Sequence, residues 1–124
     1  MHTVLVVDDS AYMRSLVKKI VTDCGFTVIG EAENGRVGVE KYKDLNPDIV
    51  IMDVVMDELD GLEALKQIIS YDNDAIIFMA SSMMDQKLYV EDAIALGAKA
   101  FLSKPFEFQQ FRETLTRYLN EWKK

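Results

Sequence analysis

DIVIMDVVMDELDG, residues 48–61, is the stretch of sequence that decides the fold. Its apolar residues 49–52 form a run of the length of a buried strand, and a carboxylate follows directly at Asp53. A strand that is apolar on both faces is typical of a sheet covered by helices on both sides. An acid at the end of such a strand has a rigid, buried support and still reaches solvent at the strand tip.

Short apolar runs recur along the chain, and stretches with helical spacing separate them. The runs are residues 4–7, 27–30, 49–52, 75–80 and 100–102. Helical spacing of apolar residues, strong in some stretches and weak in others, is found in residues 13–21, 35–45, 62–69, 86–96 and 108–122. This alternation predicts an α/β fold, with a mainly parallel sheet between two layers of helices, as a single domain over residues 1–124.

Length, composition and charge limit the class of protein. The 124 residues, 49% of them apolar and 28% charged, correspond to about one soluble globular domain. The net charge of −7 indicates a surface that repels phosphate backbones and anionic lipids, so we expect no nucleic-acid binding. The chain has one cysteine, Cys24, no signal-peptide pattern and no apolar run near the roughly 18 residues of a membrane span, which favours a cytoplasmic protein without membrane insertion.

Polar residues collect at the ends of the apolar runs. Those at or just after the carboxyl end of a run are Asp8, Asp9, Asp53, Ser81, Ser82 and Lys104. In an open parallel sheet this edge carries the ligand site, in the crevice where the strand order reverses. If the first and third runs are neighbouring strands, the three aspartates converge at that point.

Three carboxylates in one pocket repel each other, and a single pair at ~4 Å costs roughly 4 kcal/mol at an effective dielectric constant of about 20. Mg²⁺ offsets such repulsion, because it prefers oxygen ligands and needs only two or three acids. Lys104 adds a second positive charge, suited to a carboxylate or to a phosphate oxygen. Acids, Mg²⁺, a lysine and a hydroxyl are the components of phosphoryl transfer to a carboxylate nucleophile.

Four segments carry a resemblance to a known family. VLVVDDSAYMR, IVIMD, the serine of FMASSM, and FLSKPF resemble the receiver domains of bacterial and archaeal response regulators. The first and last are most similar to the stand-alone, CheY-like chemotaxis type, and the resemblance covers residues 3 to about 120. It implies a flavodoxin-like three-layer sandwich with a five-stranded parallel sheet of order 2-1-3-4-5, an order for which CheY is itself a standard example.

The resemblance also implies a role for each site residue. Asp53 would accept the phosphoryl group, and Lys104 would contact first this acceptor and then the phosphoryl group. Mg²⁺ would be bound by Asp53 and Asp9 directly, by Asp8 through water, and by the backbone carbonyl of Val55.

Two further residues would act as a switch. Ser82 lies 22 residues before Lys104, as the family's hydroxyl does, and would close onto the phosphate. This spacing favours Ser82 over Ser81. Phe101 would be the aromatic residue that moves with the hydroxyl, and the Lys104-Pro105 peptide bond is expected to be cis.

The surroundings of the acceptor differ from the usual family pattern. Met83 stands where the family usually has a small residue, and Val55 and Met84 are apolar at two further positions that tune hydrolysis in the family. We expect slow autodephosphorylation, because bulky apolar groups restrict the water that would attack in line.

The resulting hypothesis is a signalling module and not an enzyme. A histidine kinase would phosphorylate Asp53. The face made by the fourth helix, the fifth strand and the fifth helix would then control docking to a target in chemotaxis, such as a flagellar or archaellar switch. We expect the protein to be a monomer. Alternatives are a receiver fragment of a larger regulator, for example a chemotaxis methylesterase, a phosphorelay intermediate, and a scaffold that needs no phosphorylation.

Other classes fit the sequence less well. An aspartyl-nucleophile hydrolase needs its acids together after the first strand, whereas Asp53 follows the third run. A flavin protein would bind the FMN phosphate where Asp8 and Asp9 would repel it. Taken singly, the aspartate pair and Ser82 could also be helix N-caps.

Overall fold

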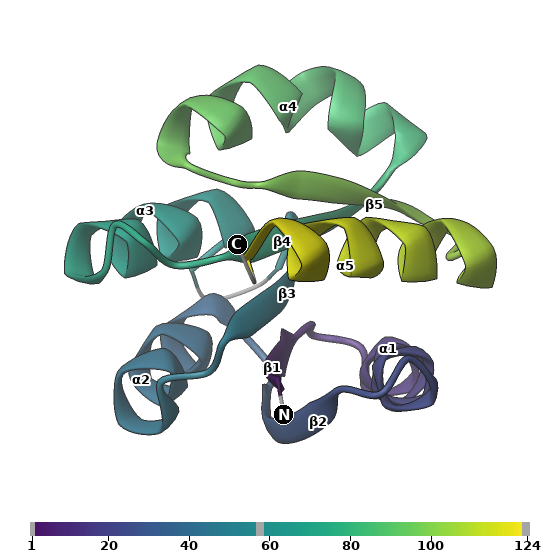
Figure 1. Cartoon of the computed structure of the whole chain (residues 1–124). Helices are drawn as coiled ribbons and strands as arrows, with labels where there is room; N and C mark the ends of the chain where they lie inside the picture. The colour runs from purple at the N-terminus through teal and green to yellow at the C-terminus, as the bar shows by residue number, and fades with distance from the viewer. Residues whose placement is uncertain (1, 57–58, 123–124) are drawn as a thin grey trace.

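The structure, a computed structural model, describes residues 2–56 and 59–122, with all their side chains except those of Met83 and residues 118–122. Strands and helices alternate throughout this part of the chain (Figure 1). In chain order they are β1 (Thr3–Val7), α1 (Ala11–Asp23), β2 (Thr27–Ala32), α2 (Gly35–Leu45), β3 (Ile49–Asp53), α3 (Gly61–Tyr71), β4 (Ile77–Ser82), α4 (Met83–Leu96), β5 (Ala100–Lys104) and α5 (Phe108–Trp122). In the described ranges, no helix has the length and apolar character needed to cross a membrane.

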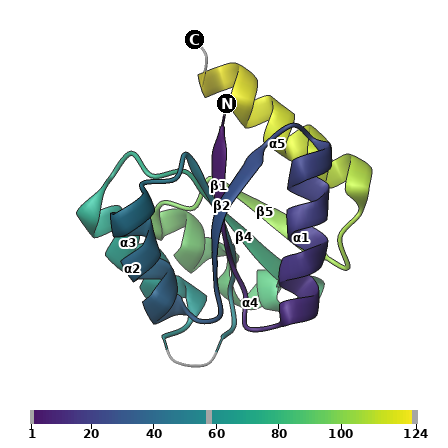
Figure 2. The same ribbon diagram turned by 90° about the horizontal axis from the view of Figure 1, so that it is seen from below.

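The strands of the described residues form one parallel sheet of order β2-β1-β3-β4-β5. Because β1 pairs with both β2 and β3, the strand order reverses beside it. Figure 2 shows α1 and α5 on one face of this sheet and α2 and α3 on the other, and Ala93 of α4 packs into the apolar cluster of α2 and α3. The fold class and the strand order predicted from the sequence are therefore confirmed.

The apolar run of residues 49–52 is continuous because its two faces meet different cores. Val50 and Met52 belong to the cluster formed with α2, α3 and α4, whereas Ile49 and Ile51 belong to the cluster formed with α1 and α5. All four are at most 1% exposed, and complete burial of each such side chain stabilises the fold by about 1.5–3 kcal/mol. β3 is thus a rigid central support for whatever follows it.

Several strands extend beyond the apolar runs of the sequence. Asp53 ends β3, Ser82 ends β4 and Lys104 ends β5, and Ser82 pairs with Lys104 in the parallel ladder. The sequence placed Ser82 and Lys104 after their strands, which is wrong by these few residues. The ladder continues because backbone hydrogen bonds do not require an apolar side chain. The Lys104-Pro105 peptide bond is cis, as expected.

Candidate functional site

An acidic pocket lies at the carboxyl edge of the sheet, beside the point where the strand order reverses. Asp8 and Asp9 follow β1 and Asp53 ends β3, and one carboxylate oxygen from each lies within 4.8 Å of the other two. Lys104 reaches in from β5, with its Nζ 3.1 Å from Asp8 Oδ2 and 3.4 Å from Asp53 Oδ2. The structure therefore brings together the four charged residues that the sequence placed at this edge.

Asp8 is buried and each of its carboxylate oxygens has a partner. Oδ1 accepts a hydrogen bond from the Ser10 N–H at 2.9 Å, and Oδ2 accepts one from Lys104. The Asp8 N–H donates to the carbonyl of Ala32, which ends β2, at 3.0 Å. The N-cap of α1 is Ser10, so the alternative in which Asp8 or Asp9 caps this helix is wrong.

Asp53 is 8% exposed, and its contacts are longer than those of Asp8, with Lys104 Nζ 3.4 Å from its Oδ2. Its Oδ1 accepts a long hydrogen bond, 3.4 Å, from the N–H of Val55. Burial raises the pKa of Asp53 to about 6, with Lys104 lowering it and Asp8 raising it. A carboxylate that is buried without full compensation gains from an added cation or from esterification of one oxygen.

The two serines at the end of β4 lie in different environments. The hydroxyl of Ser82 accepts a hydrogen bond from the Asp85 N–H at 3.1 Å and so caps the N-terminus of α4. Ser81 is fully buried, and its hydroxyl has no hydrogen-bond partner among the described residues. In this structure the N-cap role considered for Ser82 is therefore real, and its hydroxyl is engaged at α4 and not at the aspartates.

Three other residues singled out in the sequence lie on β5 and on the segments that follow β3 and β4. Phe101 of β5 is half-buried and packs against the cluster under α4. Val55 and Met84 are 50% and 73% exposed, on segments that leave the ends of β3 and β4. The side chain of Met83 lies outside the described part of the structure.

A contact that the sequence analysis missed involves Arg14. Its Nη1 donates to the backbone carbonyl of Asp8 at 2.8 Å, and its Nε donates to Glu31 Oε1 at the same distance. The segment VLVVDDSAYMR was used for its acids, and the arginine within it received no role. One available signal was a cation in the first turn of a helix, where the helix dipole disfavours positive charge.

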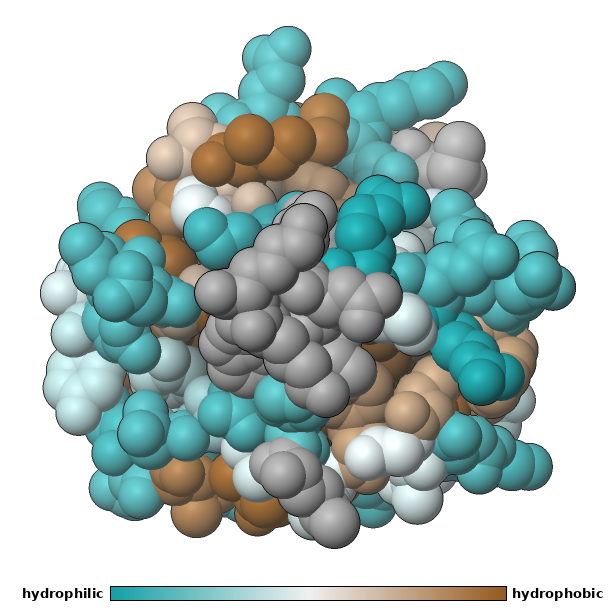
Figure 3. Space-filling view, in the orientation of Figure 1, coloured by the Kyte–Doolittle hydropathy of each residue, from teal (hydrophilic) through white to brown (hydrophobic). Residues whose placement is uncertain are grey.

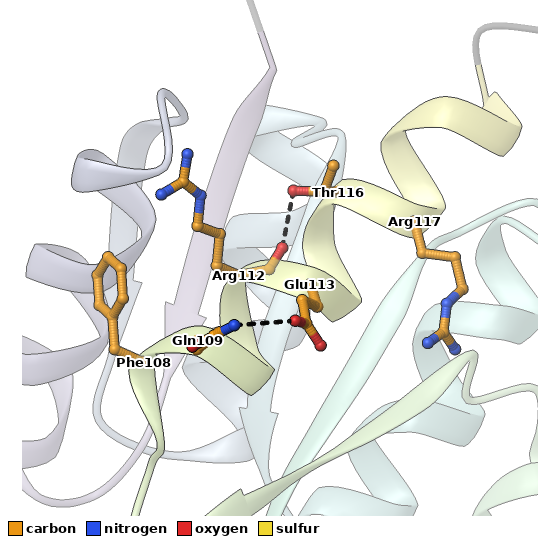
Figure 4. A pocket seen from close by; sticks show the side chains of 6 residues that line it. All are labelled: Phe108, Gln109, Arg112, Glu113, Thr116 and Arg117. Carbon is orange, nitrogen blue, oxygen red and sulfur yellow. Dashed lines mark hydrogen bonds between the residues drawn. The ribbon is translucent and has the colours of Figure 1, made fainter.

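Two further features lie on the surfaces of α4 and α5. In Figure 3 brown atoms gather over α4 on a mostly teal surface. Among the described side chains of α4, the large apolar ones that are exposed are Met84, Leu88 and Ile94. An open depression of about 850 Å³ runs along the outer face of α5 (Figure 4) and is lined by Phe108, Gln109, Arg112, Glu113, Thr116 and Arg117. It contains no residue of the acidic pocket.

Comparison with known proteins identifies the family of this chain. Residues 4–116 match the response regulator receiver domain. The chemotaxis protein CheY of Bacillus subtilis is 47% identical over 119 residues, which cover 96% of this chain and 98% of the relative. The chain therefore belongs to the response regulator receiver family. Within that family it is homologous to the CheY chemotaxis response regulators.

Solved structures agree with this assignment. A chain in the crystal structure of the CheX-CheY-BeF3-Mg²⁺ complex from Borrelia burgdorferi superposes with a TM-score of 0.88 at 33% identity, covering 95% of this chain and 89% of that one. The response regulator domain of Thermotoga maritima CheB gives a TM-score of 0.83 at 34% identity, covering 98% and 95% of the two chains. The family resemblance inferred from the sequence motifs is confirmed.

Proposed function

We propose that this protein is a phosphoacceptor response regulator in which a histidine kinase transfers a phosphoryl group to Asp53. The observation that carries the proposal is the convergence of Asp8, Asp9 and Asp53 on one point, with Lys104 in contact with two of them. Asp53 combines the support of a buried strand with a carboxylate whose burial is incompletely compensated.

The pocket is suited to Mg²⁺. Its donor set is three carboxylates, one of them exposed, and hard oxygen donors are the ligands this ion takes. Asp8, Asp9 and Asp53 would hold it, together with the carbonyl of Val55. When bound, Mg²⁺ supplies positive charge that offsets the carboxylate repulsion and the charge on the phosphoryl oxygens.

The residues of this chain have defined parts in the transfer. An oxygen of Asp53 forms a bond to phosphorus while the bond from phosphorus to the histidine nitrogen of the kinase breaks, and its electron pair stays on that nitrogen. Asp53 must be ionised to attack, which its pKa of about 6 allows at neutral pH. Lys104 loses one of its two negative partners when Asp53 is esterified and can then donate to a phosphoryl oxygen.

Phosphorylation would be transmitted through the end of β4. Ser82 pairs with Lys104 in the ladder and caps α4, so its movement toward the phosphoryl group alters the start of that helix. Phe101 would follow, because it packs against the cluster beneath α4. The output face would then be α4, β5 and α5, where Leu88 and Ile94 expose apolar surface.

The partners would be a histidine kinase and a chemotaxis target. The protein would act as a monomer in the cytoplasm. The Bacillus subtilis relative supports chemotaxis, and the Borrelia burgdorferi complex supports a CheX-like partner as one target. A flagellar or archaellar switch is the second target that we propose. The similarity to the receiver of Thermotoga maritima CheB supports the alternative in which these residues serve a chemotaxis methylesterase.

A phosphorylation assay tests the proposal. Purified protein is incubated with Mg²⁺ and acetyl phosphate, and intact mass reports one added phosphoryl group. We expect labelling of the wild type, and no labelling of Asp53→Asn or of the wild type in chelator. Asp85→Asn, which changes an acid of α4 outside the pocket, is the matched control. Equal labelling of Asp53→Asn and the wild type would refute the assignment of the acceptor.

A further inference from the structure

Arg14 holds the backbone between two of the pocket aspartates. Its guanidinium group donates from Nη1 to the Asp8 carbonyl and from Nε to Glu31, both at 2.8 Å. The Arg14 side chain is 16% exposed and that of Glu31 is 39% exposed, so Arg14 itself is largely covered while the bond to Glu31 is partly open to solvent. Two directed bonds from one half-buried guanidinium define its position much more closely than a surface ion pair does.

The carbonyl that Arg14 contacts belongs to the peptide group that joins Asp8 to Asp9. A peptide group is planar and includes the Cα atoms of both residues that it joins. A hydrogen bond to its oxygen therefore restrains the direction in which both aspartate side chains leave the backbone. The Asp8 N–H, bonded to Ala32, restrains the preceding peptide group in the same way.

The other end of the contact is anchored to the sheet. Glu31 lies on β2, in register with Val6 of β1. Its second carboxylate oxygen accepts from Lys18 Nζ at 2.6 Å, and its backbone carbonyl accepts from Lys41 Nζ at 2.6 Å. The hydrogen bonds from Lys18 and Arg14 lower the pKa of Glu31. Glu31 is thus a fixed anion, and Arg14 connects it to the loop that carries the aspartates.

We propose that Arg14 is a positioning residue for cation binding: it orients the Asp8–Asp9 peptide so that both carboxylates face the pocket. This inference rests on the proposed function, since it concerns the Mg²⁺ site described above. The cost of placing a cation in the first turn of α1, against the helix dipole, is consistent with such a role.

The sign of the mutational effect separates positioning from simple electrostatics. Removal of any nearby positive charge strengthens the attraction of the acidic pocket for a cation. If Arg14 acted through its charge alone, Arg14→Met and Lys18→Met would both tighten Mg²⁺ binding. If Arg14 orients the aspartates, Arg14→Met weakens binding. Loss of a residue that orients metal ligands typically reduces affinity by about 10–100-fold.

Lys18→Met is the matched control. This variant removes a cation that is bonded to the same Glu31. In the described part of the structure, Lys18 makes no hydrogen bond to Asp8. We measure the Mg²⁺ dissociation constant by calorimetry and, in chelator, the hydrogen exchange of the Ser10 amide, which donates to Asp8. The expected result is a dissociation constant about tenfold or more higher for Arg14→Met than for Lys18→Met, and faster Ser10 exchange in Arg14→Met alone.

Each outcome decides a different question. Equal dissociation constants for the two variants overturn the positioning role. A wild-type protein that binds no Mg²⁺ refutes the metal site itself, which is a failure of the proposed function. If Arg14→Met does not fold, Arg14→Lys replaces it. That variant keeps the charge but loses the planar fork, so weaker Mg²⁺ binding supports the proposal and unchanged binding contradicts it.

Discussion

The Lys104 ammonium group lies 3.4 Å from the Asp53 carboxylate, yet it does not outweigh the burial of that carboxylate. Burial, with a smaller contribution from Asp8, raises the pKa of Asp53 from 3.8 to about 6 against the opposing effect of Lys104. Between these two pH values the native state binds a proton that the unfolded chain has released. Asp53 therefore contributes stability at low pH that is lost as the pH rises through about 6.

Asp53→Asn tests this linkage in metal-free protein. In chelator at a pH of about 7.5, we expect the variant to be more stable than the wild type, by on the order of 3 kcal/mol for a shift of about two pKa units. At a pH of about 4 the difference should vanish, because Asp53 is protonated in the wild type. Urea unfolding at both pH values measures it. A wild type that is the more stable protein at the higher pH would contradict the raised pKa.

Lys104→Met should change stability and cation affinity in opposite directions. It leaves Asp8, which is buried, without its charged partner, so the free energy of unfolding in chelator should fall by on the order of 3 kcal/mol. Mg²⁺ should bind more tightly, because a competing cation has gone. Arg36→Met, which removes an exposed pair with Glu40, is the control and should shift stability by less than about 1 kcal/mol. Calorimetry measures the Mg²⁺ affinity and urea unfolding measures the stability. A loss of both in Lys104→Met would contradict direct competition between Lys104 and Mg²⁺ in the pocket.

The sequence predicted the fold well where burial leaves a pattern. The apolar runs and the helical spacings recover all the strands and helices of the described residues. Gly38 weakens the pattern of α2, but the helix forms with the predicted bounds. A Cβ at Gly38 would lie 3.1 Å from the Val7 side chain, so the glycine permits close packing of α2 on β1. The first turn of α4 was missed because residues such as Met84 face solvent.

The site was predictable where it depends on strand order and unpredictable where it depends on the backbone. Asp8, Asp53 and Lys104 converge because parallel strands end at one edge. The bond from Arg14 to Asp8 was not foreseen, because its acceptor is a carbonyl that every residue possesses. The sequence also distinguished Ser81 from Ser82 only weakly, because the spacing to Lys104 was the one feature that separated two identical side chains.

Val55 should limit hydrolysis of the phosphorylated protein. Val55 lies two residues after Asp53 and its side chain is 50% exposed, and we expect this apolar group to restrict the approach of an attacking water. We expect slow loss of labelled phosphate from the wild type and loss several-fold faster from Val55→Asn, which can bind water. Leu88→Asn, a change of an exposed apolar residue further along α4, is the control. A wild-type half-life as short as that of fast chemotaxis regulators would refute the hypothesis.

Gly61 should be essential for the close approach of the start of α3 to the end of β3. A Cβ at this position would lie 2.1 Å from the Asp53 carbonyl oxygen and 2.8 Å from the Val54 Cα. Gly61→Ala therefore forces the start of α3 away from β3, and we expect the free energy of unfolding to fall by on the order of 3 kcal/mol. Gly25→Ala is the control: its site is open, so only its φ of 92° opposes the change, at about 1 kcal/mol. Similar losses in the two variants, by urea unfolding, would show that contact with β3 is unimportant.

Alanine substitutions at Ser81 and Ser82 should have opposite effects, although the two residues are neighbours in β4. Ser82→Ala removes the cap of α4 and should lower the free energy of unfolding by about 1 kcal/mol. Ser81→Ala removes a buried hydroxyl without a partner among the described residues, so stability should stay the same or rise. If Ser82 also acts as the switch residue, phosphorylation of Ser82→Ala should not increase target binding, whereas phosphorylation of Ser81→Ala should. Urea unfolding and binding of phosphorylated protein to its target measure the two effects, and loss of switching in Ser81→Ala would transfer that role to Ser81.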